Sequence, residues 1–188
     1  MEYLIFDTET TGLPKSWQAP ITKLDNWPRM VQLAWVLYNE DGKVIQRCGR
    51  IIKPEGFVIP DQVAKIHGIS TARALAEGVP VKEALTEFCR VLERRRLTLV
   101  AHNIDFDEKV VGAELLRAGI RSEFFNLPKI CTMKSAIEFC NLPGKKYPRL
   151  AELYFKLFGD DFQEAHRADA DATACGKCFF ELKKKKIV

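Results

Sequence analysis

The stretch YLIFDTETTGL, residues 3–13, joins a continuous apolar run to two acidic residues. The run at 3–6 is typical of a central strand that is covered on both faces. We expect this strand to end at Asp7. Side chains two positions apart in an extended backbone point the same way, so Asp7 and Glu9 can present two carboxylates to one point. Oxygen ligands in that arrangement suit Mg²⁺ or Mn²⁺.

The apolar pattern outward from this stretch predicts an α/β fold. Residues 30–38 and 43–52 flank the turn signal NEDG and predict an antiparallel hairpin. Residues 97–101 form another short apolar strand. Apolar side chains recur at helical spacing over 81–92 and again from about Asp105. A helix that crosses over between two strands implies a parallel pair, so the sequence predicts a mixed sheet.

Farther along the chain, the pattern becomes more helical. A short strand is expected around Ile130, followed by helices over 132–140, 149–158 and 167–185. Residues 14–28 contain three prolines, two tryptophans and no clear period, which predicts a long loop.

Length and composition indicate one globular domain covering residues 1–188. Hydrophobic residues make up 47% of the chain and charged residues 29%, as in soluble proteins. No apolar run approaches the roughly 20 residues of a membrane span, and the first residues lack the pattern of a secretory signal. We therefore expect a cytoplasmic protein with no membrane partner. The net charge of +4 suits a polyanionic partner but does not identify one.

Six cysteines raise the question of disulfides or a zinc site. A cytosolic location disfavours disulfides. Cys175 and Cys178 form a C-x-x-C pair, but no second close pair completes a four-ligand site. We expect free thiols that behave as small apolar residues.

Two further segments, HNIDFD at 102–107 and HRADAD at 166–171, place acids where helices are expected to begin. Each acid has an ordinary explanation alone, because the first turn of a helix favours carboxylates and Asp105 could be an N-cap. The combination is more informative, since four carboxylates and a histidine are the minimum set for two-metal hydrolysis of a phosphodiester. An imidazole can also take a proton from the attacking water at neutral pH. The set consists of Asp7, Glu9, Asp107, His166 and Asp171.

These motifs resemble those of the DEDDh (DnaQ-like) family of 3′–5′ exonucleases, which includes the proofreading epsilon subunit of bacterial DNA polymerase III. FDTETTGL is similar to the first family motif, HNIDFD to H-N-x-x-F-D, and HRADAD to H-x-x-x-x-D, in the same order along the chain. The resemblance implies a ribonuclease-H-like fold, with a mixed five-stranded sheet and helices on both faces.

The resemblance also implies a cofactor of two divalent cations, Mg²⁺ or Mn²⁺. Asp7, Glu9 and Asp171 would bind the first ion. Asp7 would bridge to the second ion, which Asp107 would support. His166 would be the general base.

A pocket for the 3′-terminal nucleotide is implied as well. Its expected residues are Thr10, Thr11, Gly12, Leu13, His67, Asn103 and Phe106. Leu13 would lie against the base, and His67 belongs to IHGIS, in which Gly68 would also suit the end of a helix. Trp17 and Trp27 could stack on bases, although we expect them to pack the long loop onto the protein.

The predicted activity is metal-dependent release of nucleoside monophosphates from the 3′ end of nucleic acid. The substrate would be single-stranded or 3′-ended, with DNA favoured over RNA. A DNA polymerase or other replication protein would be the partner, and Lys183–Lys186 could touch phosphates or simply end a helix. The alternatives are an RNA-trimming exoribonuclease and a non-catalytic module that binds nucleic acid or a polymerase. An aspartyl-phosphate phosphatase built on Asp7 fits poorly, because Glu9 stands where such enzymes need an aspartate.

Overall fold

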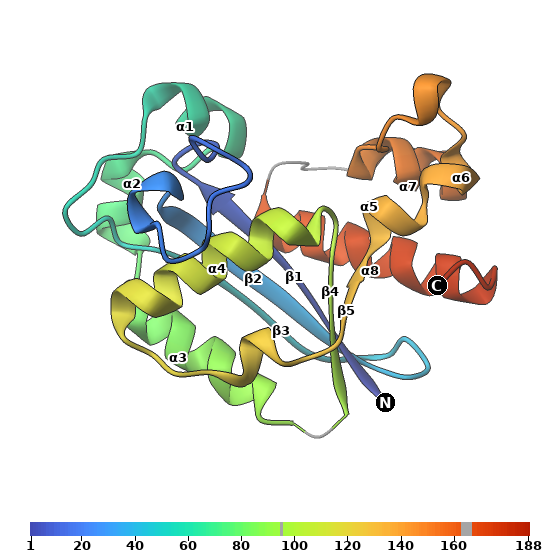
Figure 1. Cartoon of the computed structure of the whole chain (residues 1–188), viewed down its shortest axis with the longest axis horizontal. Coiled ribbons are helices and arrows are strands. Elements are labelled where there is room, and N and C mark those ends of the chain that lie inside the picture. Colours follow the sequence, from blue (N-terminus) through green and yellow to red (C-terminus); the bar gives the residue numbers. More distant parts are fainter. Residues whose placement is uncertain (95, 163–166) are drawn as a thin grey trace.

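The structure is a computed structural model that describes residues 1–94, 96–162 and 167–188. Its described part is built on a five-stranded sheet in the order β3-β2-β1-β4-β5 (Figure 1). The strands are β1 (Glu2–Thr10), β2 (Met30–Asn39), β3 (Val44–Ile51), β4 (Leu97–Ala101) and β5 (Lys129–Cys131). The pairs β1–β2 and β2–β3 are antiparallel, whereas β1–β4 and β4–β5 are parallel. The predicted mixed five-stranded sheet is therefore confirmed.

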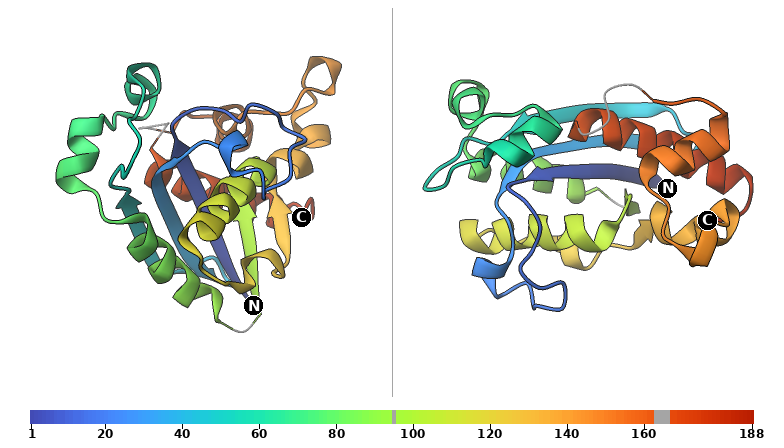
Figure 2. Two further views of the ribbon diagram at one scale, coloured as in Figure 1. Left: turned by 60° about the vertical axis from the view of Figure 1, so that its left-hand side comes forward. Right: turned by 90° about the horizontal axis from the view of Figure 1, so that it is seen from above.

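Helices cover both faces of this sheet, as predicted. The α-helices of the described residues are α1 (Asp61–His67), α2 (Thr71–Glu77), α3 (Val81–Leu92), α4 (Ile104–Ala118), α5 (Thr132–Ser135), α6 (Ile137–Cys140), α7 (Leu150–Phe158) and α8 (Ala168–Lys184). Short 3₁₀ turns lie at Leu24–Asn26, Glu123–Phe125 and Pro143–Lys145. Helices α3 and α4 lie on one face and α8 on the other (Figure 2). The helix expected over 132–140 is divided into α5 and α6 at Ala136.

The alternation of side chains in β1 explains its continuous apolar run. Leu4 and Phe6 are buried in the core beneath α3 and α4, while Tyr3 and Ile5 are buried beneath α8. Each large apolar side chain buried in this way contributes about 1.5–3 kcal/mol. A strand with both faces covered needs apolar residues at every position, which is why this one lies at the centre of the sheet.

The expectation that β1 ends at Asp7 is wrong, because the strand continues to Thr10. The parallel pairing with β4 stops at Ile5, but the antiparallel pairing with β2 extends to the end of β1. Asp7 and Glu9 therefore lie within regular strand backbone, on the face that α8 covers. Hydrogen bonding to β2 holds these polar residues in the strand where the apolar pattern has already ended.

The smaller helices surround this core. Helices α6 and α7 pack against the outer side of α8, and α1 and α2 enclose a small cluster with Val31 and Ile59. All six cysteines are free, as predicted. Within the described ranges, no helix has both the length and the apolar character needed to cross a membrane.

Candidate active site

Three carboxylates meet at the end of β1. Asp7 and Glu9 come from the strand and Asp171 from the first turn of α8, and one oxygen of each lies within 4.8 Å of the others. Figure 1 shows the carboxyl end of β1 beside the beginning of α8. The spacing of two residues in β1 aims both strand carboxylates toward α8, because alternate strand side chains share a face.

Asp107 supplies a fourth carboxylate from α4 and is 3% exposed. One of its oxygens, Oδ1, accepts hydrogen bonds from the backbone N–H of Thr8 at 3.1 Å and from its hydroxyl at 2.7 Å. Thr8 lies beyond the last residue of β1 that pairs with β4. The Asp107 carboxylate thus accepts a backbone hydrogen bond that a neighbouring strand would otherwise accept. These hydrogen bonds hold Asp107 against the segment of β1 that carries Asp7 and Glu9.

Burial and the repulsion between neighbouring carboxylates both disfavour ionisation of the cluster. Burial raises the pKa of Asp7 well above its usual range, and the neighbouring carboxylates Asp107, Asp171 and Glu9 raise it further. Burial, followed by Asp171 and Asp107, raises the pKa of Glu9 to about 8. Burial likewise raises the pKa of Asp107 to about 7, although its hydrogen bonds from Thr8 oppose the rise.

This donor set fits a divalent cation. Carboxylate oxygens are the ligands that Mg²⁺ and Mn²⁺ prefer. Ionising several partly or fully buried carboxylates side by side is unfavourable, and a bound cation reverses the sign of that effect. The cluster is therefore chemically suited to the metal site that the sequence predicts.

The residues predicted to cradle a nucleotide continue directly from this cluster. Thr10 donates its hydroxyl to the Gly12 carbonyl at 2.7 Å, and Gly12 has a φ of 145°, which favours glycine. The side chain of Leu13 is 74% exposed. Leu13 therefore offers a large apolar side chain to a ligand, four residues beyond Glu9.

His67 lies behind this segment and is 3% exposed. Its Nδ1 accepts the backbone N–H of Ile69 at 3.1 Å, so the proton of the neutral ring is on Nε2. Burial lowers the pKa of His67, and the backbone carbonyl of Thr10 partly opposes this. Nε2 makes no hydrogen bond of good geometry to the described residues. Gly68, with a φ of 73°, ends α1 as expected.

Asn103 and Phe106 lie at the start of α4. Asn103 is the N-cap residue, in a left-handed conformation with a φ of 68°. The alternative that Asp105 is the N-cap is wrong, because the helix begins one residue before it and its carboxylate pairs with Lys134. The ring of Phe106 lies 5.7 Å from that of Trp17, between centroids.

The long loop packs onto α4, as expected. Trp27 is 3% exposed, and its Nε1 donates to the Pro20 carbonyl at 3.1 Å. Lys109 of α4 donates to the Trp17 carbonyl at 3.0 Å and lies over the Trp27 ring. Trp17 itself remains 46% exposed beside Phe106.

Two residues near the site were not foreseen from the sequence. Thr8 holds Asp107 in place, as described above. Gln32, which pairs with Glu9 across the sheet, accepts the backbone N–H of Ala168 at 3.1 Å and so fixes the start of α8. A polar residue inside the apolar strand MVQLAWVLY was the available signal for Gln32.

His102 has a structural role beside this site. Its Nε2 lies 2.9 Å from the Pro148 carbonyl and its Nδ1 lies 3.0 Å from the Thr132 hydroxyl, so the ring joins the end of β4 to α5. Burial lowers the pKa of His102 to about 4, which keeps the ring neutral.

Two further sequence predictions concern His166 and the C-terminal lysines. His166, the expected base, is outside the described residues. Lys183 lies over the ring of Tyr3, at the amino end of β1 and away from the carboxylates.

A model of an exonuclease family, the RNase T type, matches residues 4–179. The chain belongs to this exonuclease family. Membership confirms the predicted resemblance and the enzyme class, a 3′–5′ exonuclease. RNase T-type exonucleases depend on divalent metals, in agreement with the carboxylate cluster.

Individual relatives of this RNase T-type exonuclease domain differ in length. The chain is 31% identical over 186 residues to the 3′-5′ exonuclease DinG of Bacillus subtilis, covering 97% of this chain and 18% of DinG. It is 30% identical over 177 residues to the DNA polymerase III subunit epsilon of Treponema pallidum, covering 94% of this chain and 74% of that subunit.

Solved structures confirm the ribonuclease-H-like fold. Exonuclease I of E. coli, in complex with a dT13 oligonucleotide, superposes with a TM-score of 0.78 at 19% identity. The match covers 98% of this chain and 41% of exonuclease I.

Proposed function

We propose that the protein is a metal-dependent exonuclease that releases nucleoside monophosphates from the 3′ end of single-stranded DNA. The observation that carries the proposal is the meeting of Asp7, Glu9 and Asp171 within 4.8 Å, with Asp107 bound to the same stretch of β1. Bringing four acids together from three distant parts of the chain is unfavourable by itself, because burial and mutual repulsion both oppose their ionisation.

Asp7, Glu9 and Asp171 would hold one divalent cation, and Asp7 with Asp107 would hold a second. Two such cations, when bound, supply positive charge to the attacking and leaving oxygens of an in-line displacement. Thr8 keeps Asp107 against β1 through its two hydrogen bonds. Gln32 keeps the start of α8, and therefore Asp171, against β2.

Hydrolysis would proceed at the terminal phosphodiester. A water oxygen forms a bond to phosphorus as the bond from phosphorus to the 3′ oxygen of the preceding nucleotide breaks. His166 would take the proton of this water, and the 3′ oxygen of the preceding nucleotide would leave as an alkoxide that takes a proton from solvent to become a hydroxyl. Leu13 and Phe106 would contact the terminal base, with Trp17 beside Phe106 as a further ring for stacking.

The known relatives support DNA as the substrate. The epsilon subunit belongs to a DNA polymerase by name, and exonuclease I was solved with a DNA oligonucleotide. The same similarity supports association with a DNA polymerase or another replication protein.

A digestion panel tests this function. Purified protein would be incubated with DNA and RNA strands, single and double, with Mg²⁺ or with EDTA, and each strand would carry a 5′ label so that stepwise shortening is visible. We expect shortening of single-stranded DNA one nucleotide at a time, only with the metal. Shortening of RNA alone would favour the exoribonuclease, and binding without shortening would favour the non-catalytic module.

A further inference from the structure

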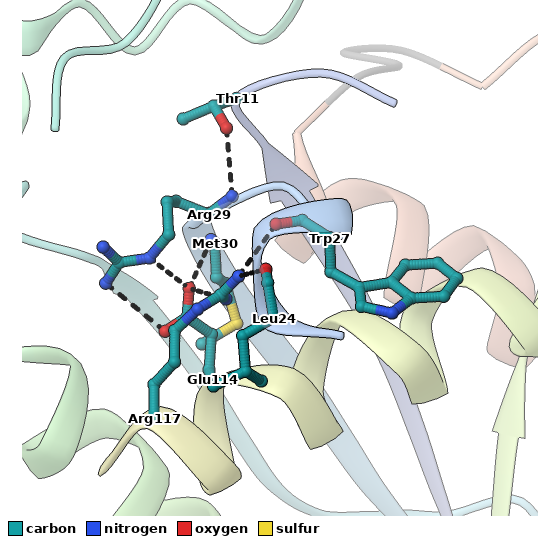
Figure 3. Close-up of polar contacts among 7 residues, drawn as sticks. All are labelled: Thr11, Leu24, Trp27, Arg29, Met30, Glu114 and Arg117. Carbon is teal, nitrogen blue, oxygen red and sulfur yellow. Dashed lines mark hydrogen bonds and ion pairs between the residues drawn. The ribbon is translucent and has the colours of Figure 1, made fainter. Parts of the chain in front are cut away.

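Glu114 of α4 is a fully buried carboxylate outside the acidic cluster, and it lies between two arginines (Figure 3). Its Oε1 accepts from Nε of Arg29 at 2.8 Å and from the backbone N–H of Met30 at 3.1 Å. Nη1 of Arg117 lies 3.0 Å from the same oxygen as an ion pair. We call Arg29, Glu114 and Arg117 the charged triad.

The charged triad joins α4 to the far end of the long loop. Nη2 of Arg117 donates to the backbone carbonyls of Leu24 at 2.6 Å and Trp27 at 2.8 Å. Figure 3 shows both carbonyls pointing toward this guanidinium. The triad thus fixes residues 24–30 through contacts to the backbone as well as to side chains.

The residues fixed in this way hold the predicted nucleotide pocket. Arg29 donates its backbone N–H to the Thr11 hydroxyl at 3.0 Å, and its carbonyl accepts the Thr11 N–H at 2.9 Å. Met30 pairs with Thr10 after a β-bulge, at which the pairing of Glu9 with Gln32 shifts by one residue. Bulges next to active sites redirect side chains. Here the bulge separates the part of β1 that carries Asp7 and Glu9 from residues 10–13.

We propose that the charged triad is a group of positioning residues that sets the conformation of residues 10–13 against the 3′-terminal nucleotide. The inference rests on the proposed exonuclease function, because that function supplies the nucleotide. A long loop that includes the 3₁₀ turn Leu24–Asn26 leads away from residue 13. The loop returns at 24–30, where Arg29 and Met30 hold Thr11 and Thr10, and the triad anchors that return to α4.

Stability alone is a poor explanation for the triad. Replacing a buried ion triad with apolar side chains of similar volume is often neutral or stabilising, because burying the charges is unfavourable. An apolar replacement here would remove the contacts to Met30, Leu24 and Trp27 and leave the volume filled. Such a variant separates positioning from simple packing.

The test uses the triple variant Arg29→Met/Glu114→Leu/Arg117→Met and the single variant Arg117→Met. The single variant retains the Arg29–Glu114 pair, so Glu114 keeps a buried partner. It therefore tests the proposal if the triple variant does not fold. The matched control is Arg50→Met/Glu87→Leu, which removes a two-bond Arg–Glu pair between β3 and α3. KM and kcat would be measured on labelled single-stranded DNA. The Kd for the same strand would be measured by fluorescence anisotropy in EDTA, where no cleavage is expected.

We expect KM and Kd to rise roughly 3–10-fold in the two triad variants, with kcat changing by less than about threefold, because substrate must then order the loop. The control should keep wild-type KM and Kd. A folded triad variant with wild-type KM and Kd would overturn the proposal. If the wild-type protein binds but does not cleave, the proposed function fails and Kd alone decides on the triad. If it neither binds nor cleaves, both proposals are wrong.

Discussion

Alanine in place of Asp171 is expected to lower the rate of nucleotide release by on the order of 10³-fold or more while the protein remains folded. The loss follows from the position of this carboxylate, within 4.8 Å of those of Asp7 and Glu9. Folding should be retained because alanine is the best helix former and the substitution removes a repulsive charge. Single-turnover cleavage of labelled DNA in Mg²⁺ measures the loss, and thermal unfolding checks the fold.

The matched control is Asp169→Ala, two residues earlier on α8. Asp169 pairs with Arg167 and does not belong to the group of three converging carboxylates. We expect this variant to cleave within about threefold of the wild-type rate. Equal losses in both variants would point to damage of α8 rather than loss of a metal ligand, and full activity of Asp171→Ala would refute the assignment.

Glu9→Gln is expected to stabilise the metal-free protein at alkaline pH even though it removes a metal ligand. The pKa of Glu9 is raised to about 8 in the folded protein, from an ordinary value of 4.5. Between these values the folded state binds more protons than the unfolded state, so stability falls as the pH rises from 4.5 to 8 and stays low above that. Glutamine carries no charge, so the variant does not lose this stability as the pH rises.

Thermal unfolding in EDTA at pH 5 and pH 9 measures the difference. At pH 9 the melting temperature of Glu9→Gln should exceed that of the wild type by roughly 3–8 °C, and at pH 5 the two should nearly agree. Mg²⁺ at pH 9 should stabilise the wild type and have a much smaller effect on the variant. The control is Glu138→Gln, at a carboxylate that is 78% exposed. A variant no more stable than the wild type at pH 9 would show that the cluster carries no unfavourable charge.

The sequence predicted the centre of this fold well because β1 carries two patterns at once. Its apolar run identifies a central strand, and the spacing of Asp7 and Glu9 places both carboxylates on one face. The end of the strand could not be read in the same way. Thr8 and Thr10 are polar, and they remain in the strand only because β2 pairs with them. Helix α2 was not predicted, and α1 was indicated only by its end at Gly68, because a seven-residue helix has too few turns for its apolar period to be detected.

The charged triad, in contrast, could not be predicted from the sequence. Glu114 is one glutamate in a helix, and nothing near it in the chain indicates that it is buried. Its partner Arg29 lies 85 residues away. Long-range contacts of this kind depend on how the loop returns to β2, and neither periodicity nor a motif specifies that path.

The central claim is that Asp7, Glu9, Asp107 and Asp171 together bind divalent cations. Anomalous diffraction from crystals soaked in Mn²⁺ tests it most directly. We predict one manganese peak among Asp7, Glu9 and Asp171 and a second between Asp7 and Asp107, with the first lost in Asp171→Ala. Ordered carboxylates with no manganese among them at millimolar Mn²⁺, or manganese bound only elsewhere on the protein, would contradict the account.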